Sequence, residues 1–238
     1  MAVSPEILFE DASILVVNKM PGIAVIPERV STGKLSLQSM LEKQFGKLYV
    51  VHRIDRDTSG VICFARTEAA HRHLSKQFEN RETRKFYSAI VEGRLEGQAG
   101  EISAPVLENP ARLGTMMVHP RGKEALTLFE VQEQFQHAAL LRVEIKTGRT
   151  HQIRIHFASC GHPLLVDPIY GKDAFFLSSI KKKYKQTEEA ERPTLARLSL
   201  HAALLEFKHP QTGESLHLEA ALPKDLETAL KILRKYDS

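Results

Sequence analysis

The chain of 238 residues contains no tryptophan, only two cysteines and no long apolar run. A membrane-spanning helix needs about 20 consecutive, mainly apolar residues, and no stretch of the sequence approaches that pattern. The first thirteen residues also lack the basic and then apolar segments of a secretory signal peptide. These absences predict a cytoplasmic protein that neither crosses a membrane nor is secreted.

Metal and cofactor sites lack their usual sequence signals. Cys63 and Cys160 both lie within apolar patterns and have no metal-binding spacing, which predicts a reduced compartment without disulfides. Neither His151 with His156 nor His71 with His73 has the i, i+4 spacing of a metal-binding helix. No glycine-rich phosphate loop follows a strand pattern, so we expect no metal ion and no cofactor.

The charge is only modestly basic, with a formal net charge of +4. This value is compatible with RNA binding but does not establish it. A dense lysine run, Lys181 to Lys185, lies in a stretch of about residues 173–195 that resembles a basic loop insertion. A solvated loop explains this run as well as a binding surface does.

The most informative segment is His52 to Gly60, His-Arg-Ile-Asp-Arg-Asp-Thr-Ser-Gly, which precedes the apolar run Val61 to Ala65. Positive charge beside a carboxylate favours its ionised form, which suits an aspartate that acts as nucleophile or base. The arginines suit a phosphate-bearing substrate. The alternative is a salt-bridged loop between two strands, since surface ion pairs are common and contribute little.

A second segment, Gly148-Arg149-Thr150-His151-Gln152-Ile153-Arg154-Ile155-His156, follows a half-buried strand. That strand is predicted by the alternation of apolar and polar residues from 139 to 146. Thr150 is expected to cap a short helix with an apolar stripe of Ile153, Phe157 and Cys160, which Gly161 ends. The helix dipole disfavours cations in the first turn, so we expect Arg149, His151 and Arg154 to meet something negative.

Together these segments resemble the RluA family of pseudouridine synthases, in the family's order and over nearly the whole chain. The pattern His-Arg-Leu-Asp-x-x-Thr-Ser-Gly is His52 to Gly60, with Ile54 for leucine, and Lys-x-Tyr-x-Ala is Lys85 to Ala89. The pattern Gly-Arg-Thr-His-Gln-(Ile/Leu)-Arg-x-His is Gly148 to His156. Lesser marks are Gly122 to Thr127, His162-Pro163 with Asp167 and Tyr170-Gly171, and Leu200-His201-Ala202.

Two positions depart from the family pattern. Near the start the family reads Asn-Lys-Pro-x-Gly, whereas this chain has Asn18-Lys19-Met20-Pro21-Gly22. Where the family often has Gly-Asp, this chain has Val166-Asp167. Both departures lie away from the expected chemistry and put the shapes of loops in doubt more than the activity. The resemblance implies a short form without the N-terminal RNA-binding domain of many members.

The resemblance also implies the roles of individual residues in isomerising uridine to pseudouridine within RNA. Asp55 is the catalytic carboxylate, Arg154 pairs with it, and Tyr87 stacks on the uracil near the C5 proton. Asp57 is interpreted as a loop carboxylate that satisfies the backbone or Arg56. The residues expected to bind RNA are Arg53, Lys85, Arg149, His151 and Leu200. His52, His151 and His201 are candidates for phosphate or backbone contacts.

The coarse pattern predicts an α+β fold, a single domain over residues 1–238 with a mixed, mainly antiparallel curved sheet flanked by helices. Apolar runs and two-residue alternation predict strands at about 14–17, 61–65, 86–93, 126–134 and 139–146. Helices are expected after Ser36, at about 68–79, after Thr150 and at about 226–236. The resemblance implies the same architecture, the pseudouridine synthase fold.

Several alternatives stay open at this point. Asp55 either attacks C1′ or removes the C2′ proton, and the substrate is a structured stem-loop of ribosomal RNA, transfer RNA or both. We expect a monomer without an obligate protein partner. The competing functions are a metal-independent RNA phosphodiesterase that uses histidines, and an RNA-binding protein without catalytic activity. Retention of Asp55 and Tyr87 argues against the latter.

Overall fold

The computed structural model describes residues 5–27, 35–182, 184 and 190–238. Its internal contacts divide the chain into two compact units. The first unit comprises Met1–Phe86 and His201–Ala221, and the second comprises Tyr87–Leu200 and Leu222–Ser238. The chain passes from the first unit to the second within strand β5 (Arg84–Glu92).

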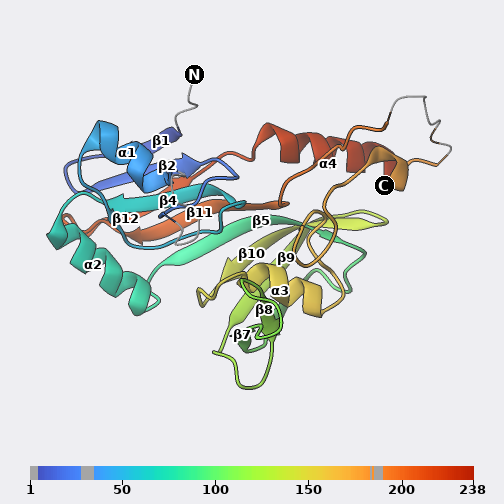
Figure 1. Ribbon diagram of the computed structural model, residues 1–238, viewed down its shortest axis with the longest axis horizontal. Coiled ribbons are helices and arrows are strands. Elements are labelled where there is room, and N and C mark those ends of the chain that lie inside the picture. Colours follow the sequence, from blue (N-terminus) through green and yellow to red (C-terminus); the bar gives the residue numbers. More distant parts are fainter. Residues whose placement is uncertain (1–4, 28–34, 183, 185–189) are drawn as a thin grey trace. The chain divides into compact units, whose positions relative to one another are not determined.

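The first unit is a sheet in the order β1-β2-β4-β11, with β12 beside β11 and β3 beside β4 (Figure 1). Strands β2 and β4 are antiparallel, whereas β4 and β11 are parallel through His201 opposite Ser59 and Ala202 opposite Gly60. Its elements are β1 (Glu6–Glu10), β2 (Ile14–Lys19), α1 (Leu37–Phe45), β3 (Tyr49–Val50), β4 (Ser59–Ala65), α2 (Glu68–Glu79), β11 (Leu200–Lys208) and β12 (Ser215–Glu219).

The central strands of this unit are mainly apolar because helices cover both of their faces. Successive strand residues point to opposite faces, so Ile14, Val16, Val61 and Cys63 form one core cluster with Ala70 and Leu74 of α2. Helices α1 and α2 lie on opposite sides of these strands in Figure 1. The predicted cap of α1 is confirmed, because the Ser36 side chain accepts a hydrogen bond from the Ser39 N–H.

The second unit contains the strand order β5-β10-β9-β6 and a separate antiparallel hairpin, β7–β8. In β10 the predicted apolar face is buried, since Ala139, Leu141 and Val143 are inaccessible to solvent and Ile145 is only 8% exposed. Its further elements are β6 (Ala99–Ser103), β7 (Val106–Glu108), β8 (Met116–Val118), β9 (Leu126–Gln134), β10 (Ala138–Ile145), α3 (Gln152–Ser159), the 3₁₀ turn η1 (Leu177–Ser179) and α4 (Lys224–Tyr236).

Helix α4 covers this unit with an apolar stripe. Leu226, Ala229, Leu230 and Leu233 recur at helical spacing and pack into a cluster that includes Ile90 of β5. The ends of the expected insertion at about 173–195 join in an isolated bridge between Phe175 and Leu195. Lys183 and Lys185 of its lysine run lie outside the described residues.

The predicted fold class, α+β with a mixed, mainly antiparallel sheet flanked by helices, is confirmed. The single catalytic domain over residues 1–238 stays a prediction, because the contacts separate two compact units. Two local predictions are wrong. Cys160 is exposed and does not continue the buried stripe of α3, and Thr150 does not cap that helix. The N-cap is His151, in a left-handed conformation with φ 52°.

Candidate active site

Asp55 lies in a loop of the first unit between β3 and β4, and the backbone holds this loop in one conformation. The Thr58 N–H donates to the Asp55 carbonyl at 3.2 Å, which closes a turn around the aspartate. The next carbonyl, that of Arg56, accepts the Gly22 N–H at 3.0 Å. Asp55 is half-buried and Asp57 is exposed. No described residue forms a hydrogen bond or ion pair with Asp57, so its expected contact with Arg56 or the backbone is absent.

Lys19 also holds the loop of Asp55 in place, and the sequence did not identify it as a residue of the site. Its side chain is fully buried, and its ammonium donates to the carbonyls of Met20, Ile23 and Arg56 at 2.9, 2.9 and 2.7 Å. A buried ammonium is costly unless its donors are satisfied. The lysine therefore connects the turn after β2 to the loop of Asp55. The sequence signals were a lysine that ends an apolar strand and its place in the mark Asn18 to Gly22, which lies beside the loop of Asp55 and not away from it as expected.

The other end of the loop is held where β4 pairs with β11. Gly60 has φ 116°, and a Cβ on this residue would lie 2.1 Å from the Ala202 carbonyl oxygen. Such a distance is far below van der Waals contact, so only glycine fits. Beside it, Ser59 Oγ lies 2.9 Å from His201 Nδ1, and His201 Nε2 lies 3.1 Å from the Ala220 carbonyl. His201 is fully buried and makes the predicted backbone contact rather than an exposed phosphate site.

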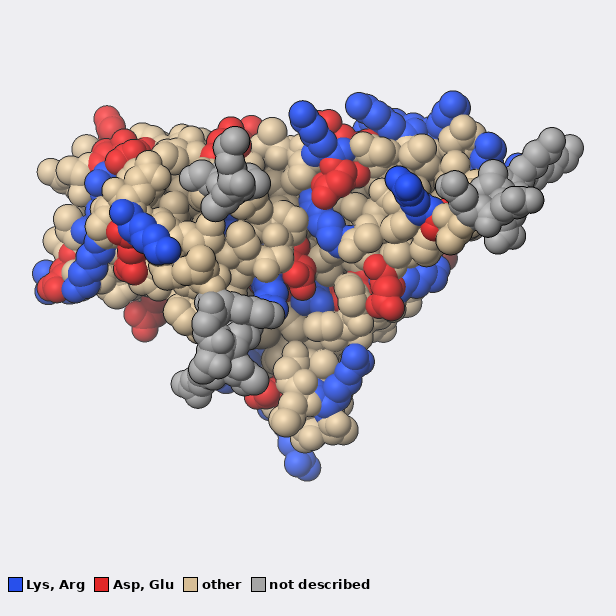
Figure 2. Space-filling view, turned by 45° about the horizontal axis from the view of Figure 1, so that its top comes forward, with Lys and Arg blue, Asp and Glu red and all other residues tan. Residues whose placement is uncertain are grey.

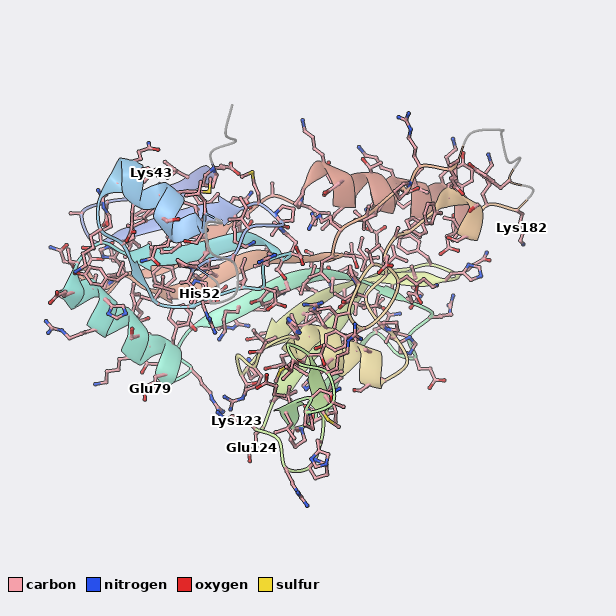
Figure 3. All side chains as sticks on the ribbon, viewed as in Figure 1. Lys43, His52, Glu79, Lys123, Glu124 and Lys182 are labelled. Atoms are coloured by element: carbon pink, nitrogen blue, oxygen red, sulfur yellow. The ribbon has the colours of Figure 1, made fainter. Side chains whose placement is uncertain are left out.

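His52 is held as a neutral ring. It stacks on Phe78 of α2 with ring centroids 4.7 Å apart, and its Nε2 accepts the Cys63 N–H at 3.0 Å. Burial, with a smaller contribution from the charge of Lys85, lowers the pKa of His52 to about 3. His52, labelled in Figure 3, therefore supports the loop and is not an acid–base group near neutral pH.

Two predicted RNA-binding cations belong to the first unit. Arg53 is exposed, and no described residue forms an ion pair or hydrogen bond with it. Lys85 is half-buried, and its ammonium lies 5.8 Å from the centre of the Phe78 ring. Burial, and next the charge of Arg81, lower the pKa of Lys85. A bound anion beside Lys85 would stabilise its charged form against both of these effects.

In the second unit, Gln152 fixes the loop before α3. Its Oε1 accepts the Arg149 N–H and the Thr147 hydroxyl at 3.0 and 2.7 Å. Its Nε2 donates to the Leu126 carbonyl and to Thr127 Oγ1, both at 3.0 Å. All four hydrogen-bonding positions of this buried carboxamide are thus used.

His156 continues this network on the next turn of α3. Its Nε2 donates to the Ala104 carbonyl and its Nδ1 faces Thr127 Oγ1, both at 2.9 Å. Burial lowers the pKa of His156, which keeps the ring neutral and lets Nδ1 accept the threonine hydroxyl. Gln152 and His156 are therefore structural members of the motif that carries Arg154.

Arg154 has a carboxylate partner that the sequence analysis did not identify. Its Nε and Nη2 donate to the two oxygens of Asp167, at 2.8 Å each. Both side chains are buried, with 4% and 0% of their surfaces exposed. The expectation that Arg154 meets something negative is confirmed. The single Asp-x-x-Tyr-Gly mark, Asp167 to Gly171, was the available signal in the sequence.

The Tyr170 ring packs against the same arginine. The Arg154 guanidinium carbon lies 5.2 Å from the centre of the Tyr170 ring, within cation–π range. The Tyr170 hydroxyl accepts the Met116 N–H at 2.6 Å and lies 2.8 Å from His151 Nδ1. His151, predicted to bind RNA, is thereby held at the start of α3.

The remaining predicted residues of this unit are Tyr87, Arg149 and Leu200. Tyr87 lies in β5 with 8% of its surface exposed, and Leu200 begins β11 with 3% exposed. Arg149 is half-buried, and its Nε donates to the Glu124 carbonyl at 2.9 Å. Figure 3 labels Glu124 in the loop that leads from the β7–β8 hairpin to β9.

The structure thus groups Asp55 with Arg53 and Lys85 in the first unit. It groups Tyr87, Arg149, His151, Arg154 and Leu200 in the second. The pairing of Arg154 with Asp55 joins residues of the two units and stays a prediction. Among the described residues, no three His, Cys, Asp or Glu side chains gather as a metal site would require. No helix in the described ranges has the length and apolar character needed to cross a membrane.

Comparisons with known proteins identify the family to which the chain belongs. Residues 13–159 match the RNA pseudouridylate synthase family. Ribosomal large subunit pseudouridine synthase C of Yersinia pestis is 39% identical over 233 residues, which cover 96% of this chain and 69% of that protein. Ribosomal large subunit pseudouridine synthase D of Zymomonas mobilis is 36% identical over 241 residues, which cover 96% and 72%.

A solved structure also matches. The human RNA pseudouridylate synthase domain containing 1 superposes with a TM-score of 0.70 and 25% identity, over 98% of this chain and 96% of that one. The family match spans Asp55, Tyr87 and Arg154 alike.

Proposed function

The chain belongs to the RNA pseudouridylate synthase family and isomerises uridine to pseudouridine in RNA, and we propose that its substrate is a stem-loop of large-subunit ribosomal RNA. The family and fold expected from the sequence are thereby confirmed. The choice of ribosomal over transfer RNA rests on the names of the relatives, two of which act on the large ribosomal subunit. A monomeric state and a cytoplasmic location are further parts of the proposal.

In this reaction the N1–C1′ bond of a uridine breaks, the uracil turns, and its C5 bonds to C1′ while the C5 proton leaves. The target base is stacked within RNA, so it must leave the stack, which costs a few kcal/mol. We assign the catalytic carboxylate to Asp55, which attacks C1′ or removes the C2′ proton. Tyr87 is assigned to the uracil face, and Arg154 to orienting the carboxylate.

One observation carries the assignment of Asp55. Lys19, Gly22 and Thr58 hold the backbone carbonyls of Asp55 and of the next residue, while Asp55 itself stays half-buried. A nucleophile or base gains from being held near its target before reaction. Asp57, two residues on, is exposed and has no such support.

RNA binding is assigned to local groups of cations rather than to one broad basic surface. Figure 2 shows lysine and arginine side chains interspersed with acidic ones. Arg53 and Lys85 serve phosphates on the first unit, and Arg149 and His151 do so on the second. Leu200 is assigned to an apolar contact with the RNA.

The test compares Asp55→Asn with Asp57→Asn on a large-subunit RNA transcript, with release of the C5 hydrogen as the readout. Asn keeps the shape of Asp55 but removes its charge, so activity should vanish while RNA affinity and the melting temperature change little. Asp57→Asn should retain most activity. The reverse result would transfer the role to Asp57. Shortening of the transcript would instead show a phosphodiesterase, since isomerisation leaves chain length unchanged.

A further inference from the structure

The turn from Asp167 to Gly171 joins the helix of Arg154 to the β7–β8 hairpin in the second unit. Asp167 Oδ1 accepts the N–H groups of Ile169 and Tyr170 at 2.9 and 3.2 Å, in addition to Arg154 Nη2. One buried carboxylate therefore fixes both the turn and the guanidinium. Displacement of the turn shifts the carboxylate that orients Arg154.

Two hydrogen bonds connect the hairpin to this turn. The Met116 N–H in β8 donates to the Tyr170 hydroxyl at 2.6 Å, and Arg112 Nη1 donates to the Ile169 carbonyl at 3.2 Å. Leu113, which lies between Arg112 and Met116 in the loop of the hairpin, is 87% exposed. The loop end of the hairpin is thus exposed at Leu113 and, on either side of that residue, attached to the turn beside Arg154.

Tyr170 is the residue where these contacts meet. Its hydroxyl serves Met116 and His151, its ring packs edge-on against His151 at 5.6 Å, and its face lies under the Arg154 guanidinium. His151 has φ 52°, which costs energy for any residue except glycine. The contact with Tyr170 stabilises this conformation three positions before Arg154.

We propose that Tyr170 is a positioning residue for the reaction, which orients Arg154 and transmits the position of the β7–β8 hairpin to it. This proposal rests on the proposed function only in that Arg154 serves catalysis. RNA that contacts the exposed end of the hairpin then acts on Arg154 through the hydroxyl of Tyr170. Substrate binding and completion of the catalytic geometry are coupled by this path.

The experiment measures single-turnover rate and RNA dissociation constant separately for Tyr170→Phe. The variant keeps the ring under Arg154 and removes only the hydroxyl. We expect the rate at saturating enzyme to fall about 10-fold, since small misplacements of a catalytic group have effects up to about 100-fold. The dissociation constant should stay within about 2-fold of that of the wild type. A parallel loss of affinity and rate would overturn the proposal, because Tyr170 would then be an RNA contact.

The pH profile separates positioning from proton transfer. A positioning residue lowers the rate equally across the profile, so Tyr170→Phe should keep the shape of the wild-type curve. Loss of one limb of the curve would show that the hydroxyl itself titrates in the reaction, which contradicts positioning. Tyr49→Phe is the matched control, because its hydroxyl bonds exposed Glu68 at 3.3 Å in the first unit.

A double-mutant cycle tests whether Tyr170 acts through Arg154. In an Arg154→Lys background, Tyr170→Phe should change the rate by less than about 2-fold, because residues that act through one another are not additive. A full 10-fold effect in that background would overturn the proposed path. This outcome is independent of Asp55→Asn, whose full activity would instead refute the catalytic assignment under the proposed function.

A surface variant covers the case in which Tyr170→Phe lowers the melting temperature below the assay range. Arg112→Ala removes the second link between hairpin and turn without opening the core, since Arg112 is exposed. A lower rate with unchanged affinity supports the coupling. Unchanged rate, or a loss of affinity alone, rejects it.

Discussion

The carboxylate of Asp167 accepts hydrogen bonds from both Nε and Nη2 of Arg154, at 2.8 Å each, inside the second unit. The pair uses two of the five N–H donors of the guanidinium and fixes its plane. The guanidinium of Arg154, which we assign to the reaction, is therefore oriented by a partner of its own unit.

Asp167→Asn should destabilise the protein strongly. Removing one charge of a buried pair leaves the other uncompensated, which costs about 3–5 kcal/mol. Asp225→Asn is the matched control, because Asp225 also binds an arginine at two points but is 45% exposed. Surface pairs contribute about 1 kcal/mol or less. Urea denaturation measures both variants, and equal losses would refute the distinction.

Arg154→Lys should lower turnover strongly while RNA affinity changes little. Lysine keeps the positive charge but lacks the planar fork that meets two carboxylate oxygens. Turnover and affinity are measured on the same RNA. If both fall by the same factor, Arg154 is mainly a phosphate contact.

Lys19→Met should reduce both activity and the free energy of unfolding. The substitution leaves three carbonyls without the ammonium that they share, and unsatisfied buried polar groups cost about 1–3 kcal/mol each. Lys43→Met, at an exposed lysine of α1 labelled in Figure 3, is the control and should change neither quantity. Full activity of Lys19→Met would show that the Asp55 loop holds its shape without it.

Stability should fall as the pH drops below about 6.5, in part because of His52. The unfolded chain takes up a proton near its ordinary pKa of 6.5, whereas folded His52 stays neutral down to about 3. Acid therefore favours unfolding, by up to about 1.4 kcal/mol per pH unit, and the contribution is complete above pH 6.5. His156, whose pKa is also lowered by burial, acts in the same direction.

The measurement is urea denaturation between pH 4 and pH 8. His52→Gln should flatten the dependence of stability on pH, because glutamine accepts the Cys63 N–H without titrating. An unchanged slope in that variant would show that His52 titrates at the same pH in the folded and the unfolded protein.

RNA affinity should fall steeply with salt, because cations at phosphates release condensed counterions. Selectivity should come from a loop whose uridine flips readily, so a small stem-loop should be modified almost as well as the full-length RNA. Its fully paired version should be modified poorly at any salt, since extrusion from a stem costs more. Equal rates on the looped and paired forms would contradict this mode of recognition.

Local patterns in the sequence predicted most elements, and contacts between distant segments were the part that they did not predict. Alternating residues gave β10 and helical spacing gave α2, because burial on one face leaves a period in the sequence. The partners of Arg154 and Lys19 lie in other segments, 13 residues away for Asp167 and 37 for Arg56. A periodic pattern of apolar residues gives no information about such pairs of distant residues.

The two wrong local predictions, the cap at Thr150 and the buried position of Cys160, also come from contacts that local patterns do not show. Thr150 carries a good capping side chain, but the left-handed backbone at His151 and the carboxamide of Gln152 satisfy this loop instead. Cys160 continues an apolar spacing, yet α3 ends at Ser159, so the next position turns to solvent. Tertiary hydrogen bonds outweighed local preference at both sites.

Gly60 has a consequence for how the chain tolerates change. Gly46 and Gly213 also have positive φ, but open space surrounds the position of a Cβ at both, whereas at Gly60 the backbone of Ala202 occupies it. In a saturation library position 213 should accept asparagine, whereas position 46, with φ 73° and ψ −161° in a region that only glycine populates, and position 60 should accept only glycine. The backbone of Ala202 thus fixes the residue type where the Asp55 loop enters β4, so changes in the shape of this loop must arise at other positions.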